Sequence, residues 1–557
     1  MEQAPNSTLS EPRSLELVFG LVAPVGVDLD LVTEVLTETL AEFAYATEAR
    51  SFQLTNLMTQ VSVPESLTSR TYIESVRRKI AYANRVREHI GDDGLALLAV
   101  AAIRRYRAKK NEALRRSQQL ALFDAAQSEE LEQVPLANQA YVIRQLKRPE
   151  EAQALRRVYG KRFVLISAYS PLEARRTFIG EKERKSCGGL GNDVDIEAQV
   201  NALIALDAMQ ADNTHGQAVR DAFPLGDVFI EASTRKSCEE ALRRFMRLFF
   251  GDNQITPSRD EYAMYLAKSA SLRSGDLSRQ VGAAIFSSSG EVVTLGCNEV
   301  PKSGGGTYWP DSVPDGRDFA LGYDPNERLT QELLVDLIDR LKSHGDLAER
   351  FEKEEAAIKI ANELLTDQAS DGVGKARLLD IIEFGRIIHA EMSALSDAAR
   401  KGLSTQDATL FCTTFPCHLC AKHIVAAGIR RVVFLEPYPK SYAWKLHRDS
   451  IEVDQRDHPT KVSFEAFIGI SPYRYRELFE KKSRKKDGSV QQWSRGAPEP
   501  MIDIYYPEYF QAEVHFAARL QQALRAVERQ AALPGVEPNS IQIPERNVGP
   551  DQGPEPP

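Results

Sequence analysis

The stretch 389–420 reads HAEMSALSDAARKGLSTQDATLFCTTFPCHLC and decides how the C-terminal half of the chain is interpreted. His389, Cys417 and Cys420 offer the nitrogen and sulfur ligands that zinc prefers, and three protein ligands leave one tetrahedral position open, as in a catalytic site. Cys417 and Cys420 are three residues apart, so a helix that begins after Pro416 places both on one face. The dipole of that helix also favours two thiolates at its N-terminus. The stretch predicts a catalytic zinc site.

Glu391 lies two residues after His389, at the start of a helix predicted to end near Gly402. It is not needed as a ligand, and a carboxylate there can take a proton from a water activated by the metal and deliver protons to a substrate. Glu391 is therefore the candidate catalytic residue. The alternative is a structural zinc knuckle, which needs a fourth protein ligand; His418 or His423 is the candidate, although the cysteine pair already uses the metal-facing side of that helix.

Length and composition restrict the class of protein. A chain of 557 residues is expected to hold two or more domains. Its net charge of -9 argues against a generally basic nucleic-acid binder. It has no apolar run of membrane-spanning length and no signal-peptide pattern, which predicts a cytoplasmic protein without a membrane span. Six cysteines are too few for a disulfide framework. Those outside the zinc site are expected to be free thiols: Cys187, Cys238, Cys297 and Cys412.

The N-terminal half begins with a strand, a glycine-containing loop and a helix within residues 15–43. Such a loop can direct backbone N–H groups at a phosphate. Gly20 and Gly26 are separated by five residues, one more than in a standard P-loop, and Val27-Asp28 stand where Lys-Ser/Thr is required. We predict a P-loop-like fold with Gly20, Gly26 and Asp28 as candidate nucleotide-binding residues, and no phosphotransferase activity.

Further strands at 141–146, 162–168 and 223–232 alternate with helices, which predicts a parallel sheet. Between them, segment 175–195 is rich in charge and glycine and has two interpretations. One is a solvated loop; the other is a lid over phosphates whose cations are Arg175, Arg176, Arg184 and Lys185. The basic segment 104–116 is expected to be a solvated helix face, with contact to RNA as the alternative.

In the C-terminal half, strands at 280–286 and 291–297 form a predicted hairpin. Four motifs occur in order: Val281-Gly282-Ala283, the GCNEVP segment 296–301, the H-A-E segment 389–391 and the P-C-H-L-C segment 416–420. The last two match the signature of zinc nucleobase deaminases. Together the four motifs resemble the deoxycytidylate deaminase branch of the cytidine deaminase superfamily. With the first half included, the architecture resembles bacterial antiphage dCTP/dCMP deaminases.

That resemblance implies an α/β protein in which a P-loop-like parallel sheet with helices precedes a three-layer α/β/α deaminase fold with a helical insertion. It implies zinc-dependent hydrolytic deamination of dCTP and/or dCMP to dUTP or dUMP and ammonia. The expected organisation is a disordered segment 1–13, a P-loop kinase-like domain 14–234, a helical linker 235–256, a deaminase domain 257–480 with insertion 304–385, a mobile loop 481–500, a C-terminal helix 501–532 and a disordered tail 533–557.

The resemblance also implies roles for single residues. Glu391 shuttles protons, Asn298 bonds the deoxyribose, and the Ala390 N–H meets the pyrimidine O2. The Thr414 carbonyl accepts from the 4-amino group. Phe415 lines the substrate pocket, and Tyr438 stacks on the base. The candidates for contact with the substrate phosphate are Lys440, Ser441, Arg279 and the loop Gly304–Gly306.

The expected partners are free deoxycytidine nucleotides, a regulatory nucleotide at the N-terminal domain, an RNA or protein repressor, and further copies of the chain in a dimer or hexamer. Three alternative functions are also compatible with the sequence. The first is a cytidine deaminase that acts on RNA or single-stranded DNA, which needs a basic channel and aromatic platforms. The second is a nucleotide-sensing toxin restrained by its partner, and the third is a nucleotide kinase fused to a deaminase, which Val27-Asp28 disfavours.

Overall fold

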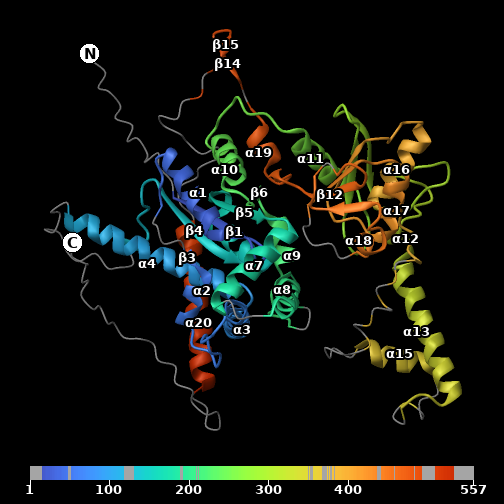
Figure 1. The fold of residues 1–557 in the computed structure, drawn as a ribbon, viewed down its shortest axis with the longest axis horizontal. Coiled ribbons are helices and arrows are strands. Elements are labelled where there is room, and N and C mark those ends of the chain that lie inside the picture. The colour runs from blue at the N-terminus through green and yellow to red at the C-terminus, as the bar shows by residue number, and fades with distance from the viewer. Residues whose placement is uncertain are drawn as a thin grey trace, which may run out of the picture. The chain divides into compact units, whose positions relative to one another are not determined.

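The computed structural model describes residues 16–531, apart from 48–51, 118–130, 189–191, 209, 211–212, 349–350, 352–355, most positions in 367–382, 436–440, 457, 482, 492 and 494–508. The chain forms two compact units (Figure 1). The first is Met1–Thr256 together with Tyr473–Pro557, and the second is Pro257–Pro472.

The first unit is built on a parallel sheet in which β1 lies between β4 and β5, with β6 beyond β5, and with β2 and β3 paired to β4. Every residue of β1 and β5 is buried, so both faces of the sheet are covered, as parallel sheets require. The parallel sheet expected from the alternating pattern is confirmed. Its strands are β1 Leu17–Val22, β2 Ala46–Thr47, β3 Phe52–Gln53, β4 Gln139–Leu146, β5 Phe163–Tyr169 and β6 Val228–Glu231.

Helices of the first unit come from both ends of the chain. The amphipathic helix α10 packs against α1 and β6, and the C-terminal helix α20 packs against α3, α4 and α6. The helices are α1 Leu29–Glu42, α2 Leu54–Leu57, α3 Tyr72–Ile90, α4 Gly94–Ser117, α6 Pro149–Tyr159, α7 Leu172–Ser186, α8 Asp193–Ala208, α9 Val219–Ala222, α10 Arg235–Phe249, α19 Tyr475–Phe479 and α20 Tyr509–Ala531; the short strands β14 Lys485–Lys486 and β15 Ser489–Val490 form a hairpin.

Two sequence predictions in this unit were wrong. The first strand runs on to Val22, so Gly20 lies inside β1 and not in a phosphate loop. A Cβ at Gly20 would approach side-chain atoms of Leu146 and Phe163 at 2.7 and 2.8 Å. Glycine is therefore needed here because a side chain would clash with these two residues of the core. The segment interpreted as a loop or lid is largely the helix α7, because Arg175, Ile179 and Glu183 recur on one buried face.

The basic segment of α4 is not simply a solvated face, because Arg107 is completely buried. Its guanidinium forms ion pairs with Glu16 at 2.8 Å and with Glu513 at 2.7 Å. The hydroxyls of Tyr141 and Tyr509 donate to Glu16, each at 2.7 Å. This Arg107 cluster joins the chain just before β1, the middle of α4 and the C-terminal helix α20.

The second unit has a mixed sheet in the order β11-β12-β10-β9-β7-β8. The pairs among β11, β12, β10 and β9 are parallel, and β7 is antiparallel to both β9 and β8, so the expected hairpin is confirmed. The elements are α11 Arg259–Ser271, β7 Gly282–Phe286, β8 Val292–Cys297, α16 Ala390–Lys401, β9 Thr409–Cys412, α17 His418–Ala426, β10 Arg431–Phe434, α18 Ala443–Leu446, β11 Ile451–Val453, β12 Val462–Ala466 and β13 Gly469–Ile470.

Two glycines of the hairpin let helices approach the sheet closely. A Cβ at Gly282 would lie 1.9 Å from the Ala267 carbonyl oxygen of α11, and a Cβ at Gly296 would lie 2.2 Å from the Ala390 carbonyl oxygen of α16. Gly282 is paired with Cys297 and Gly296 with Ala283, so the two glycines point to opposite faces of the sheet. The unit therefore has helix layers on both faces, with α16 seated on the backbone of β8.

Replacing Gly296 by alanine is expected to destabilise the second unit by roughly 1–3 kcal/mol, because the new methyl group must push α16 away from β8. Since α16 carries His389 at its N-terminus, affinity for zinc should fall as well. Thermal unfolding and a competitive zinc titration measure the two effects. Val292→Thr, an exposed position on the same strand β8, is the control; equal effects of both substitutions would contradict the role given to Gly296.

The insertion is helical, as predicted. It contains α12 Asp318–Leu321, α13 Pro325–His344 and α15 Ala357–Thr366. The helices α13 and α15 pack together around Leu334, Ile338 and Ile360. Across the described part of the chain, the helices are either too short or too polar to cross a membrane.

Candidate zinc site

The three predicted ligands come from the N-termini of two neighbouring helices. His389 is the N-cap residue of α16, Cys417 is the N-cap residue of α17, and Cys420 lies in the first turn of α17. Their helices are in contact. Because α17 begins directly after Pro416-Cys417, the i, i+3 spacing places both sulfurs on one side, as the sequence predicted.

The ligand atoms converge. The His389 Nδ1 atom lies 3.3 Å from the Cys417 Sγ and 3.4 Å from the Cys420 Sγ. Zinc bound tetrahedrally by one imidazole nitrogen and one thiolate would hold these atoms about 3.6 Å apart. Hydrogen bonds to the Cys417 sulfur, first from Cys420 and then from His389, lower the pKa of this thiol and favour its thiolate. The residues present therefore fit a zinc ion, and the described chain supplies three ligands and no fourth.

Glu391 is buried beside these ligands, with 3% of its surface exposed. Burial raises the pKa of its carboxyl group, and a hydrogen bond from the Cys412 thiol acts in the opposite direction. Burial also raises the pKa of Cys412 well above its ordinary value, so the thiol stays protonated and can donate to Glu391. Cys412 is a free cysteine, as predicted, but no sequence pattern indicated that it lies beside Glu391.

Asn298 is buried and organises the loop that precedes β7. Its Oδ1 accepts from the Val281 N–H at 2.7 Å, and its Nδ2 donates to Asp276 Oδ2 and to the Arg279 carbonyl, both at 2.8 Å. Both Nδ2 protons of Asn298 are used in these bonds. A sugar hydroxyl would therefore have to donate to Oδ1, which can accept a second hydrogen bond. The Arg279 N–H donates to the Asp276 Oδ1 at 3.3 Å. Both backbone polar groups of Arg279, its N–H and its carbonyl, are therefore hydrogen-bonded.

This loop lies next to the metal ligands. The Gly282 carbonyl accepts from the Thr413 N–H at 3.0 Å, shortly before Cys417. On the other side, Glu299 and Ile388 exchange backbone hydrogen bonds at 3.1 and 3.3 Å, directly before His389. The charge of Arg279 acts on His389. The Arg279 side chain is exposed and forms no ion pair or hydrogen bond with any residue that the structure describes.

The other predicted site residues lie as follows. Ala390 is buried in the first turn of α16, where helix N–H groups have no intrahelical acceptor. Phe415 packs in the core with ring centroids 4.8 Å from Phe434 and 5.5 Å from Phe464. Thr414 is half-buried between Cys412 and Phe415, and Ser441 accepts from the Ala443 N–H at the start of α18. Tyr438 and Lys440 lie outside the described residues.

Residues 257–436 match the family described as "Cytidine and deoxycytidylate deaminase zinc-binding region". They form a zinc-binding deaminase region. The deaminase region is also similar to curated proteins over short stretches. The deoxycytidylate deaminase of Enterobacteria phage T2 is 46% identical over 54 residues, which are 10% of this chain and 29% of the phage protein. ComE operon protein 2 of Bacillus subtilis (strain 168) is 42% identical over 72 residues, which are 13% of this chain and 38% of that protein.

This chain thus spans well under half the length of these relatives. Among solved structures, a dCMP deaminase from the cyanophage S-TIM5 in apo form covers 38% of this chain and 100% of its own, at 18% identity and a TM-score of 0.20.

Proposed function

We propose that the protein catalyses zinc-dependent hydrolytic deamination of deoxycytidine nucleotides, with dCMP and dCTP as substrates. One observation carries the proposal: His389, Cys417 and Cys420 bring three ligand atoms within 4.8 Å of one another, and the buried Glu391 lies two residues from the histidine. The similarity of the deaminase region to deoxycytidylate deaminases supports a deoxycytidine nucleotide over other amidine substrates.

In this mechanism a zinc ion, when bound, supplies a Lewis acid that lowers the pKa of a ligated water. Glu391 accepts a proton from the attacking water, which adds to C4 of cytosine. The same carboxyl group delivers that proton to N3 of the ring, then takes the remaining proton from the hydroxyl group on C4 and passes it to the leaving amine, so that ammonia departs and uracil remains. The Ala390 N–H orients the pyrimidine O2. The Cys412 thiol orients Glu391 through its hydrogen bond.

The test is release of ammonia, with chromatography of the product, from purified protein supplied with dCMP, dCTP, CTP, deoxycytidine or a cytosine-containing oligonucleotide. We expect turnover of dCMP, dCTP or both. Turnover of the oligonucleotide alone would contradict the proposal and favour a polynucleotide deaminase. From the resemblance to antiphage enzymes we also propose that depletion of deoxycytidine nucleotides limits phage growth, which plaque assays with the Glu391→Gln variant test. We further propose that the active form is a dimer or hexamer, which light scattering tests.

Replacing Arg279 by alanine is expected to separate nucleotide from nucleoside substrates. The backbone of Arg279 is fixed by Asn298 and Asp276, while its guanidinium is uncommitted beside the site. If it binds the substrate phosphate, the loss of one charge-assisted contact should lower kcat/KM for dCMP by about 10- to 100-fold and leave deoxycytidine unchanged. Steady-state kinetics with both substrates measure this. Lys401→Ala, at the exposed C-terminal end of α16, is the control, and an equal loss for both substrates would contradict a phosphate contact.

A further inference from the structure

A second candidate site lies in the first unit, where a cavity of about 400 Å³ opens at the carboxyl ends of β1 and β4. The chain builds β2, β3 and β4 on one side of β1, and β5 and β6 on the other. The order of strands therefore reverses at β1. In open parallel sheets, ligands bind in the crevice at this kind of reversal, outside the carboxyl ends of the strands.

The position predicted for a phosphate, at the N-terminus of α1, already has protein partners. The Asp28 Oδ1 accepts from the N–H groups of Asp30 and Leu31, at 3.0 and 3.1 Å. Beneath the loop, the Lys147 ammonium donates to the Ala23 carbonyl at 2.9 Å and to Asp207 at 2.7 Å. Asp28 thus supplies the negative charge that would otherwise come from a phosphate. An anionic ligand group is expected elsewhere on the cavity.

Gln145 projects from a strained bulge at the edge of the cavity. Its φ is 72°, a left-handed conformation that is uncommon for residues other than glycine. Leu21 pairs with Arg144 and Val22 with Leu146, so Gln145 has no partner in β1. Its Oε1 accepts from Thr55 Oγ1 at 2.8 Å, which fixes the amide, while its Nε2 protons find no acceptor among the described residues. Strain of this kind is concentrated at functional positions.

Gln217 supplies the complementary group. Its side chain lines the same cavity and is 3% exposed. Its Oε1 has no hydrogen-bond donor among the described residues. A buried acceptor without a donor costs about 1–3 kcal/mol, which a ligand with an N–H group would recover. The cavity therefore offers a donor on Gln145 and an acceptor on Gln217, the combination that reads the edge of a nucleobase.

The rest of the cavity suits the other parts of a nucleotide. Tyr72 and Phe178 contribute aromatic rings to its lining, and Met58 and Leu95 add apolar surface. Lys79 of α3 and Lys182 of α7 also line it, are exposed, and have no acidic partner in the part of the chain that the structure describes. We propose that this cavity binds a nucleotide whose base meets Gln145 and Gln217 and whose phosphates lie at Lys79 and Lys182, away from the N-terminus of α1.

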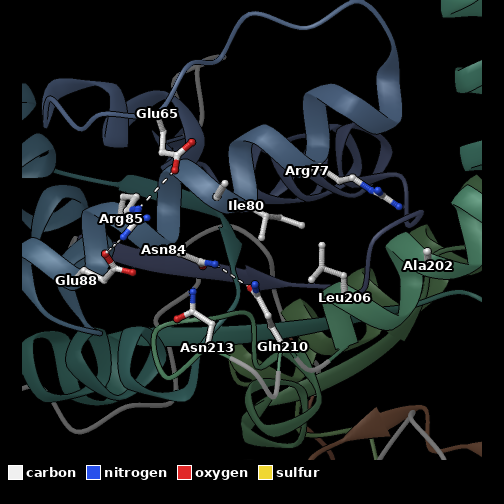
Figure 2. Close-up of a pocket in the computed structure, with 11 residues that line it drawn as sticks. Glu65, Arg77, Ile80, Asn84, Arg85, Glu88, Ala202, Leu206, Gln210 and Asn213 are labelled. Carbon is white, nitrogen blue, oxygen red and sulfur yellow. Dashed lines mark hydrogen bonds and ion pairs between the residues drawn. The ribbon is translucent and has the colours of Figure 1, made fainter. Parts of the chain in front are cut away.

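A larger hollow of about 650 Å³ in the same unit, lined by α3 and α8, provides a contrast (Figure 2). Its central polar groups are paired with one another. Arg85 forms ion pairs with Glu88 at 2.7 Å and with Glu65 at 3.5 Å, and Asn84 donates to Gln210 at 2.8 Å. These groups need no ligand, so we assign the nucleotide to the cavity of Gln217 and not to this hollow.

The proposal is tested by isothermal titration of the full-length protein with ATP, GTP, dTTP and dCTP. dTTP resembles the uracil nucleotide product and is included for comparison. ATP and GTP lack a pyrimidine ring and report on a site other than the proposed deaminase centre. We expect saturable binding of at least one of them. For that nucleotide, Gln217→Leu should raise Kd about tenfold through the lost hydrogen bond. The pair Lys79→Ala with Lys182→Ala should raise Kd for the triphosphate at least tenfold and leave binding of the matching nucleoside unchanged.

Arg85→Ala, in the neighbouring hollow on the same helix, is the matched control and should leave Kd unchanged. The two lysines are exposed, so the double variant keeps the test valid even where Gln217→Leu fails to fold. Absence of saturable binding by ATP and GTP would overturn the proposal. Binding that persists in the lysine double variant would also overturn it. The result does not depend on whether the zinc site deaminates deoxycytidine nucleotides.

Discussion

Glu391→Gln is expected to abolish deamination while zinc remains bound. The glutamine side chain has nearly the same shape and still accepts the hydrogen bond from Cys412, but it cannot take a proton from water. Loss of general acid–base catalysis lowers turnover by roughly 10²–10⁴-fold in other enzymes, and we expect at least the upper end here because one carboxyl group handles every proton transfer. Turnover of dCMP and zinc content by mass spectrometry are measured on the same preparation.

Two controls define what this result means. Asp397→Asn removes a carboxylate from the same helix, on the side where Asp397 pairs with Arg400, and should leave turnover unchanged. Cys420→Ser removes a ligand and should lose zinc together with activity. Retained turnover in Glu391→Gln would contradict the assigned chemistry. Loss of zinc in Glu391→Gln would instead make this residue a structural support for the ligands.

Arg107→Met should produce the largest change in stability. The substitution leaves Glu16 and Glu513 as two buried carboxylates without a cation. Removing one partner of a buried ion pair costs about 3–5 kcal/mol, since the other charge stays out of water. Burial already raises the pKa of Glu513 in the intact cluster. Urea unfolding should shift to a lower midpoint by an amount that corresponds to this loss.

Hydrogen exchange locates the effect. Peptides from β1, α4 and α20 should lose protection in Arg107→Met, whereas peptides from β7, β9 and α16 in the second unit should keep theirs. Arg105→Met removes an exposed arginine two residues away on α4 and should change neither measurement. If the two variants unfold at the same urea concentration, the Arg107 cluster contributes nothing to stability and the prediction is wrong.

Local chemistry explains why the zinc site could be predicted from the sequence. His389 and Glu391 are two residues apart, and Cys417 and Cys420 are three apart, so a single helical turn decides how each pair is oriented. The hairpin of β7 and β8 was equally local, because a short turn ending in Gly290 joins two apolar runs. The sequence by itself therefore determined the ligands, the candidate proton carrier and the elements that present them.

Contacts between distant segments were decided only by the tertiary structure. Asn298 stays a predicted sugar contact, but only the tertiary structure shows that its amide also binds Asp276, Arg279 and Val281, because the loop before β7 folds back over β8. Gly20 appeared as a loop glycine and lies inside β1, because the buried strand continues to Val22. A local pattern does not record which strand or loop will lie beside it.

The Arg107 cluster shows the same limit most clearly. Glu16 and Glu513 are separated by almost the whole chain, and the basic segment around Arg107 reads as a solvated helix face. A charge is buried at low cost only where groups of opposite charge replace its water. For Arg107 these groups are Glu16, directly before the first strand, and Glu513 on α20. Periodicity and ligand spacing determined the elements and the metal site, whereas the pairing of distant buried charges and the cavity of Gln217 depended on how those elements pack.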